Sequence, residues 1–433
     1  MGPVALSTVA RNHGDLWAKS PAPVTSLPRP FSQRTAPTAA NPHLADAWLA
    51  EQCADHLETN RLAVLEILTA HESHETAEED LASSIDTLRN VHRELAYLRR
   101  ATMPTISVFL PINLPLYSLI LFAAIPSLMA DRVDVRLPAA TPDWVSAVAA
   151  AAGFDRFFPR VHLLRVTRRQ FIEDYASHAS VVVFTGRPEA AEEVRAECPF
   201  GVFIFQGSGV NPIVIGPNAE LSDDVIEQII TTRIFNGGQD CAAPDAFLIH
   251  TSKAAEFVET LVDQVRTWPL GSYDDPKVRI GPILNRQALP ALEERLNALR
   301  ADTVIGGNVD RATGLVDPTV VVRPLAEHDE LTEFFAPIFY VLVYEGDHDL
   351  AAFFNRREYA DNAMYVSLFG QDPVPGLFES STVLFNRTVL DVEQGNTAFG
   401  GNGPKANYVV LGGKNVIVGP ALISETLARS TGV

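Results

Sequence analysis

The stretch TISVFLPINLPLYSLILFAAIPSLMADRVDVRL, residues 105–137, decides the fold of this chain. Its segment Ile106–Ala130 is free of charged residues and long enough to cross a bilayer, which takes roughly 20 residues. Several prolines and a central Asn113 interrupt the segment, and proline removes hydrogen bonds that a membrane helix needs. The stretch instead predicts a buried strand at 106–110, a turn, a buried helix at 116–129 and a strand at 132–137.

Short apolar strands continue to alternate with helices after this stretch. The expected strands lie at 161–166, 180–185 and 201–205, and the expected helices at 142–152, 168–178 and 188–197. This alternation is typical of a parallel sheet buried on both faces, in an open doubly wound α/β domain. Right-handed crossovers would place a ligand at the carboxyl ends of the strands.

A second unit of the same kind follows a break near Pro217. Helices are expected at 222–235, 253–267, 286–300 and 347–357, and strands at 246–250, 303–305, 318–322, 338–344 and 364–369. The chain is expected to cross back near Asn386 and to end with a strand at 415–418. Before the first unit, residues 44–70 and 77–100 have helical spacing, whereas residues 1–42 are rich in Pro, Ser, Thr and Ala.

The composition limits the classes of partner. The chain has 433 residues, enough for two or three domains, and its net charge of −19 argues against nucleic acid or an anionic membrane. Three cysteines without CxxC spacing are too few for a disulfide scaffold and do not suggest a metal site. Residues 1–10 lack the pattern of a secretory signal. We therefore expect a cytoplasmic protein.

One cysteine stands in a setting that suits chemistry. Cys241 lies in Phe235–Pro244, on a glycine turn between an amphipathic and an apolar run. A thiolate is a strong nucleophile, and we expect it to form without a strong local base. The structural alternative is a small buried hydrophobe. Asn113 likewise has two interpretations, a turn residue that caps a helix or an amide that stabilises an oxyanion.

Several further segments follow one another along the chain: Pro111–Pro115, Val183–Gly186, Phe235–Pro244, Val316–Thr319, Glu333–Pro337, Ser381–Asn386 and Ala398–Gly401. In this order they resemble segments of the aldehyde dehydrogenase superfamily, among them P-W-N-F-P (with Ile112 here replacing the aromatic residue), F-T-G-S, N-x-G-Q-x-C, E-I-F-G-P, G-x-x-x-x-N and P-F-G-G. Over roughly residues 80–420 the chain thus resembles a divergent member of that superfamily, of the acylating or acyl-thioester-reducing kind.

This resemblance implies a nicotinamide cofactor, NADP or NAD, and a set of site residues. Cys241 is the implied nucleophile and Asn113 the implied oxyanion donor. The residues expected to contact the cofactor are Ile112, Arg136, Thr185, Gly186, Arg187, Gly207, Glu333 and Phe335.

The resemblance also implies a fold of two doubly wound α/β domains with a small β element for oligomerisation. Residues 1–42 would be a loosely ordered extension, and 43–217 the cofactor-binding domain, with a returning segment near 387–413. Residues 218–386 would be the catalytic domain that carries Cys241. Residues 414–433 would be a β tail through which similar proteins form homodimers or homotetramers.

Two departures from the family pattern bear on function. Gln206 stands where hydrolytic members have the glutamate that activates water, and an amide cannot accept and hold a proton. At the cofactor site, Leu137–Ala140 replaces the family's K-P-x-E segment, so its Lys and acidic residue are absent. Arg136 either serves a 2′-phosphate or faces solvent. Arg187, in place of a small Ser, either grips the pyrophosphate or fills its site.

The expected function is oxidoreduction of an aldehyde or acyl group through a thioester on Cys241. Because Gln206 replaces the glutamate, we expect the acyl group to pass to or from a thiol, coenzyme A or an acyl or peptidyl carrier. The alternatives are oxidation of an aldehyde to an acid, reduction of an acyl phosphate, and a non-catalytic scaffold that keeps the fold.

Overall fold

The computed structural model describes residues 41–99, 102–199, 201–326, 331 and 333–430. The expected N-terminal extension therefore lies almost wholly outside the described residues. Among these, none of the helices is long and apolar enough to cross a membrane, which agrees with the interpretation of residues 106–130 as a strand, a turn and a helix.

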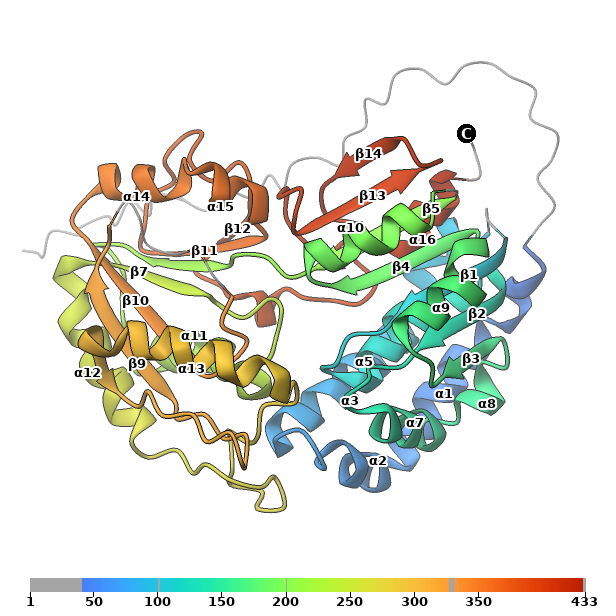
Figure 1. Cartoon of the computed structure of the whole chain (residues 1–433), viewed down its shortest axis with the longest axis horizontal. Helices are drawn as coiled ribbons and strands as arrows, with labels where there is room; N and C mark the ends of the chain where they lie inside the picture. Colours follow the sequence, from blue (N-terminus) through green and yellow to red (C-terminus); the bar gives the residue numbers. More distant parts are fainter. Residues whose placement is uncertain (1–40, 100–101, 200, 327–330, 332, 431–433) are drawn as a thin grey trace, which may run out of the picture. The chain divides into compact units, whose positions relative to one another are not determined.

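The first α/β unit contains a seven-stranded sheet in the order β14-β13-β5-β4-β1-β2-β3 (Figure 1). Strands β1 to β5 run parallel, and β13 and β14 close one edge as an antiparallel pair. The strands are β1 (Met103–Phe109), β2 (Ala130–Arg136), β3 (Val161–Leu164), β4 (Val181–Gly186), β5 (Val202–Gly207), β13 (Asn407–Leu411) and β14 (Asn415–Val418).

Successive side chains along these strands point to opposite faces of the sheet and pack into two different cores. Along β4, Val181 and Val183 point into the core formed with the helices before and after β1, whereas Val182 and Phe184 point into the core under α9 and α10. The helices of this unit are α1 (Trp48–Thr59), α2 (Arg61–Leu68), α3 (His74–Arg89), α4 (Leu95–Leu98), α5 (Pro115–Leu119), α6 (Ile125–Ser127), α7 (Pro142–Ala151), α8 (Phe154–Phe157), α9 (Arg168–Asp174), α10 (Pro188–Glu197) and α16 (Ile423–Ser430).

The helix expected at 116–129 contains a wider turn. Helix α5 passes into a π-helical turn at Ile120–Ala124 and then into α6. Pro126 lacks an N–H, and its ring would collide with the carbonyl one helical turn earlier, so the widened turn has a local cause. Leu121 and Phe122 of this turn line the cavity described below.

The second unit repeats the architecture in a sheet of order β12-β11-β6-β7-β10-β9-β8, parallel except for β8. Its strands are β6 (Pro212–Ile215), β7 (Ala246–His250), β8 (Thr303–Ile305), β9 (Thr319–Pro324), β10 (Ile338–Tyr344), β11 (Tyr365–Phe369) and β12 (Thr382–Phe385). Helices α11 (Asp223–Ile234) and α12 (Thr251–Val265) cover one face, and α13 (Leu289–Ala298), α14 (Asp347–Phe354) and α15 (Arg357–Asn362) cover the other.

The structure therefore confirms the expected fold of two doubly wound α/β units and contains further elements, among them β6, β13 and α16. Strand β6 follows directly on a glycine-rich loop, β13 returns to the first sheet, and α16 follows β14. Helix α16 folds back onto the first unit, where it packs against α4 and α6 and buries Leu427 completely.

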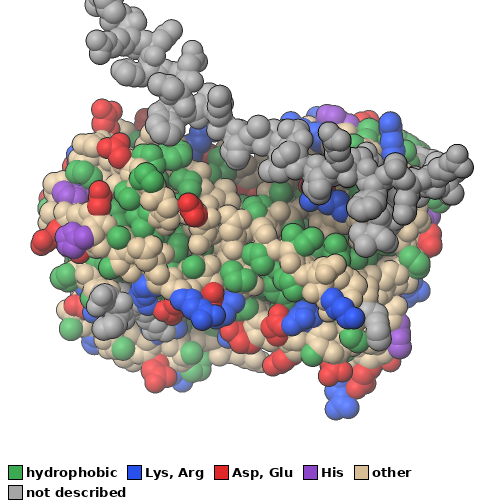
Figure 2. All heavy atoms as spheres, turned by 90° about the horizontal axis from the view of Figure 1, so that it is seen from above, with side chains coloured by type: hydrophobic (Ala, Val, Ile, Leu, Met, Phe, Trp, Pro, Cys, Tyr) green, Lys and Arg blue, Asp and Glu red, His purple; other side chains and the backbone are tan. Residues whose placement is uncertain are grey.

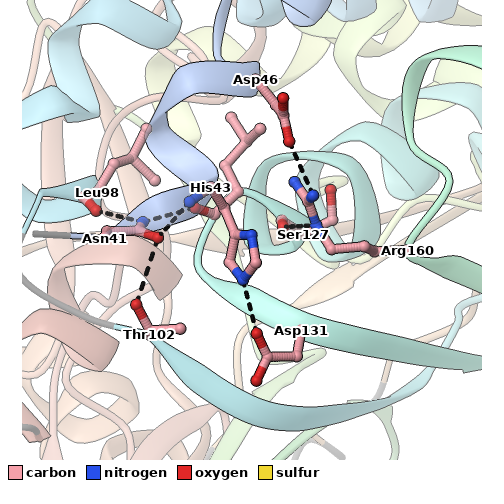
Figure 3. Close-up of polar contacts among 9 residues, drawn as sticks. Asn41, His43, Asp46, Leu98, Thr102, Ser127, Asp131 and Arg160 are labelled. Carbon is pink, nitrogen blue, oxygen red and sulfur yellow. Dashed lines mark hydrogen bonds and ion pairs between the residues drawn. The ribbon is translucent and has the colours of Figure 1, made fainter.

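The first described residues are tied to the first sheet by polar contacts (Figure 3). The Asn41 amide donates to the carbonyl oxygens of Leu98 and Leu128, each at 2.7 Å. The Arg160 side chain lies between two partners, donating to the Ser127 carbonyl at 3.0 Å and to the Asp46 carboxylate at 2.8 Å. These contacts hold the segment before α1 against the ends of α4 and α6 and the loop before β3.

The charges on the face in Figure 2 are mixed. Acidic and basic side chains are interspersed there rather than gathered by sign. The described residues on that face therefore do not form the single-sign field that attracts a polyanion.

Candidate active site

A cavity of about 910 Å³ opens at the carboxyl ends of the first sheet. The loops after β1, β2, β4 and β5 line it, together with the cysteine turn, the segment Glu333–Phe335 and residues 421–424 before and at the start of α16. This is the edge at which a parallel doubly wound sheet is expected to bind its ligand.

Every residue predicted from the sequence to act or to bind lies in the lining of this one cavity. These residues are Ile112, Asn113, Arg136, Thr185, Gly186, Arg187, Gly207, Cys241, Glu333 and Phe335. The arrangement joins the cysteine of the second unit to polar groups of the first.

The cysteine turn is built from left-handed backbone. Asn236, Gly237 and Gly238 have φ of 51°, 63° and 77°, and the Asn236 amide closes the turn by donating to the Gln239 carbonyl at 3.1 Å. A Cβ added to Gly238 would lie 2.5 Å from the Ala336 carbonyl oxygen. Glycine at 238 therefore lets the turn press against the chain that follows Glu333 and Phe335.

Two buried side chains hold this turn, and neither was predicted from the sequence to have a role in the site. Asn211 donates from Nδ2 to the Cys241 carbonyl at 3.0 Å. Arg233, 1% exposed, donates to the carbonyls of Pro244, at 3.1 Å, and Ala336. Arg233 thus joins the cysteine turn to the segment that carries Glu333. Its only sequence signal is an arginine at the apolar end of a helix.

The electrostatic setting of Cys241 is acidic. Burial, and then the charges of Asp240, Glu393 and Glu333, raise the pKa of the Cys241 thiol well above its ordinary value. The thiol is therefore neutral in the free protein near pH 7. This shift disfavours the expected thiolate, so attack by Cys241 calls for a proton acceptor nearby.

The carboxyl groups around the thiol are perturbed in the same direction. Burial raises the pKa of Glu333 to about 7 and that of Glu393 to about 8, and it raises the pKa of Asp240. The positive charge of Arg233 opposes this rise at Asp240 and Glu333. Carboxyls poised near neutrality beside a thiol can exchange protons with it.

Asn113 is held in place by the start of α5. The residue follows β1 and is 8% exposed, and the next residue, Leu114, has φ of 45°. The Asp80 carboxylate accepts from the backbone N–H groups of Leu116 and Tyr117 at 3.2 and 2.7 Å. This cap from α3 fixes the turn that presents Asn113 to the cavity.

The Gln206 side chain is hydrogen-bonded to the backbone and does not take part in proton transfer. Its Nε2 donates to the Ala421 carbonyl at 2.9 Å. The amide thus ties the end of β5 to the segment before α16, and it offers no group that could act as a base.

The lining fits a dinucleotide cofactor. Oε1 of Glu333 is shielded from solvent and has no hydrogen-bond partner among the described residues, as suits an acceptor for a ribose hydroxyl. Nε of Arg136 is likewise shielded from solvent and has no hydrogen-bond partner among the described residues. Burial lowers the pKa of this guanidinium. An anionic group at Arg136 would satisfy that donor.

Comparison with known proteins agrees with this geometry. Residues 40–404 match the family model described as Aldehyde dehydrogenase family. A succinate-semialdehyde dehydrogenase [NADP(+)] of Mycobacterium avium is 25% identical over 276 residues, covering 61% of this chain and 58% of that protein. The chain thus matches less than two thirds of the length of this curated relative.

Two solved structures show the same fold at low identity. Glyceraldehyde-3-phosphate dehydrogenase GapN from Methanocaldococcus jannaschii, complexed with NADP, has a TM-score of 0.73 at 18% identity, covering 86% of this chain and 89% of that one. Aldehyde dehydrogenase 21 from Physcomitrella patens, in complex with succinate, has a TM-score of 0.70 at 15% identity, with coverages of 87% and 86%. The chain described here belongs to the aldehyde dehydrogenase family.

Proposed function

We propose that this protein is an NADP-dependent oxidoreductase that acts on an aldehyde or acyl group through a covalent adduct on Cys241. The observation that supports the proposal most is the single cavity that holds Cys241, Asn113 and Glu333 together. NADP is preferred to NAD because the curated relatives are named for NADP(+) and because Arg136 offers an unpartnered donor to a phosphate.

The chain's own residues account for the covalent step. The Cys241 sulfur adds to the substrate carbonyl, and the Asn113 amide and the Cys241 backbone N–H donate to the oxygen that gains charge. Glu333 would hold the nicotinamide ribose beside the adduct. When bound, the nicotinamide ring supplies the site that accepts or donates hydride.

We further propose that the acyl group is exchanged with a thiol, of coenzyme A or of a carrier. Gln206 supports this step, because its amide is bonded to Ala421 and cannot activate water. A cavity of about 910 Å³ has room for an extended acyl chain.

Oxidation of an aldehyde to an acid is the second candidate. The relatives named succinate-semialdehyde dehydrogenase favour it, as do the carboxylates Asp240 and Glu393 in the cavity lining, which can take a proton from water.

One set of assays separates these candidates. NADP-linked oxidation of an aldehyde panel, including succinate semialdehyde, is measured with and without coenzyme A, and reduction of acyl-coenzyme A and of acyl phosphate is measured with NADPH. Thiol exchange requires turnover that depends on coenzyme A; equal rates without it support hydrolysis. Reduction of acyl phosphate alone supports an acyl-phosphate reductase. A protein that neither turns over nor binds NADPH in a fluorescence titration is a scaffold.

A further inference from the structure

Asp240 lies directly beside the predicted nucleophile. It is 6% exposed and lines the same cavity as Cys241. Its Oδ1 accepts from the Ala242 N–H at 3.2 Å, which fixes the carboxylate against the turn. Asp240 directly precedes Cys241 in the turn, and burial, and then the charge of Asp240, raise the pKa of the neighbouring thiol.

Glu393 faces the same thiol from a different part of the chain. It follows the short helical turn Val389–Asp391, donates from its N–H to the Val389 carbonyl at 2.9 Å, and lines the cavity. The neighbouring Gln394 accepts a hydrogen bond from Arg93 at 2.8 Å, so the loop is anchored on the first unit. Glu393 is thereby held where its charge reaches both Cys241 and Asp240.

The ionisable groups around Asp240 and Glu393 are mostly acidic. Arg233 and Glu333 act on Asp240 from the buried side of the turn. Glu79 acts on Glu393 from α3, and the phenols of Tyr117 and Tyr365 are within range of its charge. Two carboxylates in such a setting repel each other, so one of them tends to hold a proton while the other accepts one.

We infer that Asp240 is the catalytic group that takes the proton of the Cys241 thiol, and that Glu393 takes the proton of the nucleophile that later releases the acyl group. This inference rests on the proposed covalent chemistry at Cys241. The two carboxylates together supply the proton transfers for which Gln206 is unsuited.

Each carboxylate returns to its starting protonation state over one catalytic cycle. As the carbon–sulfur bond forms, the thiol proton moves to Asp240 and the carbonyl electron pair moves to oxygen. The adduct carbon would then lose its hydride to a bound nicotinamide while the electron pair on oxygen re-forms the carbonyl, which gives the thioester. In the second half, the incoming thiol or water attacks the thioester carbon and gives its proton to Glu393. The carbon–sulfur bond breaks, the Cys241 thiolate recovers its proton from Asp240, and Glu393 releases one proton to solvent.

Asp240→Asn tests the first transfer. The amide keeps an oxygen for the Ala242 N–H, so the turn retains its cap, but it cannot accept a proton. Turnover should fall about 100-fold, within the range of general acid–base catalysis. The rate of Cys241 alkylation by iodoacetamide should rise at pH 7, because removing a neighbouring negative charge lowers the pKa of the thiol. Peptide mass spectrometry confines this readout to Cys241.

A fall in turnover together with a rise in the rate of Cys241 alkylation is the result that supports Asp240 as the proton acceptor. A merely structural role would lower turnover without raising alkylation, and either that result or wild-type turnover in Asp240→Asn would overturn the inference. Asp240→Glu, which restores a carboxylate, should recover part of the lost turnover.

Glu393→Gln tests the second transfer, and Glu79→Gln is its matched control. Glu393→Gln should slow release of the acyl group, so that more acyl adduct accumulates on Cys241 than in wild type, as intact mass measures. Glu79→Gln removes one negative charge nearby but lies outside the cavity lining, so its turnover should stay within about twofold of wild type. If Glu393→Gln accumulates no more adduct than Glu79→Gln, the role of Glu393 is wrong. If Cys241→Ala retains turnover, the proposed function itself fails.

Discussion

Asn211 Nδ2 donates a 3.0 Å hydrogen bond to the carbonyl oxygen of Cys241. The same amide accepts from the Tyr365 N–H through Oδ1 at 3.2 Å. One buried side chain at the entrance to β6 therefore fastens the cysteine turn to β11. The position of the thiol depends on this link between three segments that are distant in sequence.

Replacing Asn211 with Ala should loosen the cysteine turn. The change leaves two buried backbone groups without their partner, which costs about 1–3 kcal/mol each. Urea denaturation should show a lower free energy of unfolding, and turnover should fall with it. Asn285→Ala provides the control, since Asn285 lines the same cavity and is only half-buried. Equal stability of the two variants would contradict the anchoring role of Asn211.

Gly238 and Gly376 allow backbone strain to be separated from a steric collision. Both have positive φ, 77° and 80°. A Cβ on Gly238 would lie 2.5 Å from the Ala336 oxygen, whereas a Cβ on Gly376 would meet nothing within 4 Å. Gly376→Ala should cost about 1–2 kcal/mol, and Gly238→Ala considerably more, with loss of turnover. Similar thermal melting of the two variants would show that the contact at Ala336 is not close.

Stability should decrease as pH rises from about 5 to 8.5. Burial raises the pKa of Asp80 to about 7, of Glu333 to about 7 and of Glu393 to about 8, from ordinary values near 4. Between the ordinary and the raised pKa values, the folded state therefore binds more protons than the unfolded state. The free energy of unfolding falls as the pH rises through this range. Thermal melting across this range should show the decline.

Glu393→Gln should make that decline shallower, because a neutral amide carries no charge to desolvate. We expect the variant to be more stable than wild type at pH 8.5, on the order of 1 kcal/mol, and little different at pH 5. Parallel pH profiles for the two proteins would contradict the raised pKa of Glu393.

Arg136→Gln tests the preference for NADP. If Arg136 meets the 2′-phosphate, the variant should bind NADPH at least about tenfold more weakly, since a charge-assisted hydrogen bond is worth roughly 1.5–3 kcal/mol. Its affinity for NADH should change little. Fluorescence titration measures both. Equal losses for the two nucleotides would assign Arg136 a structural role.

The fold was largely predictable because its strands are short, apolar and buried on both faces. Val108 and Val135, paired in register on β1 and β2, are both fully buried, and such runs are visible without a structure. Strand β6 was missed because Pro212–Ile215 is only four residues long and follows a glycine-rich loop. Helix α16 was missed because the exposed strand β14 before it suggested a tail of β structure.

The site was predictable only where a local motif marks it. The segments around Asn113, Cys241 and Glu333 have recognisable sequences. Arg233 and Asn211 act through contacts with residues distant along the chain, and no local pattern announces them. The raised pKa of Cys241 has the same origin, because it arises from burial and from carboxylates on three separate segments.

The most direct test of the account is the mass of the protein during turnover. Wild-type protein is mixed with an aldehyde and NADP, quenched in acid, digested and analysed by mass spectrometry. Covalent catalysis by Cys241 predicts an acyl group on this residue, in the peptide that contains residues 235–244, and no adduct or turnover in Cys241→Ala. Turnover without an adduct on Cys241, or unchanged turnover in Cys241→Ala, would contradict it.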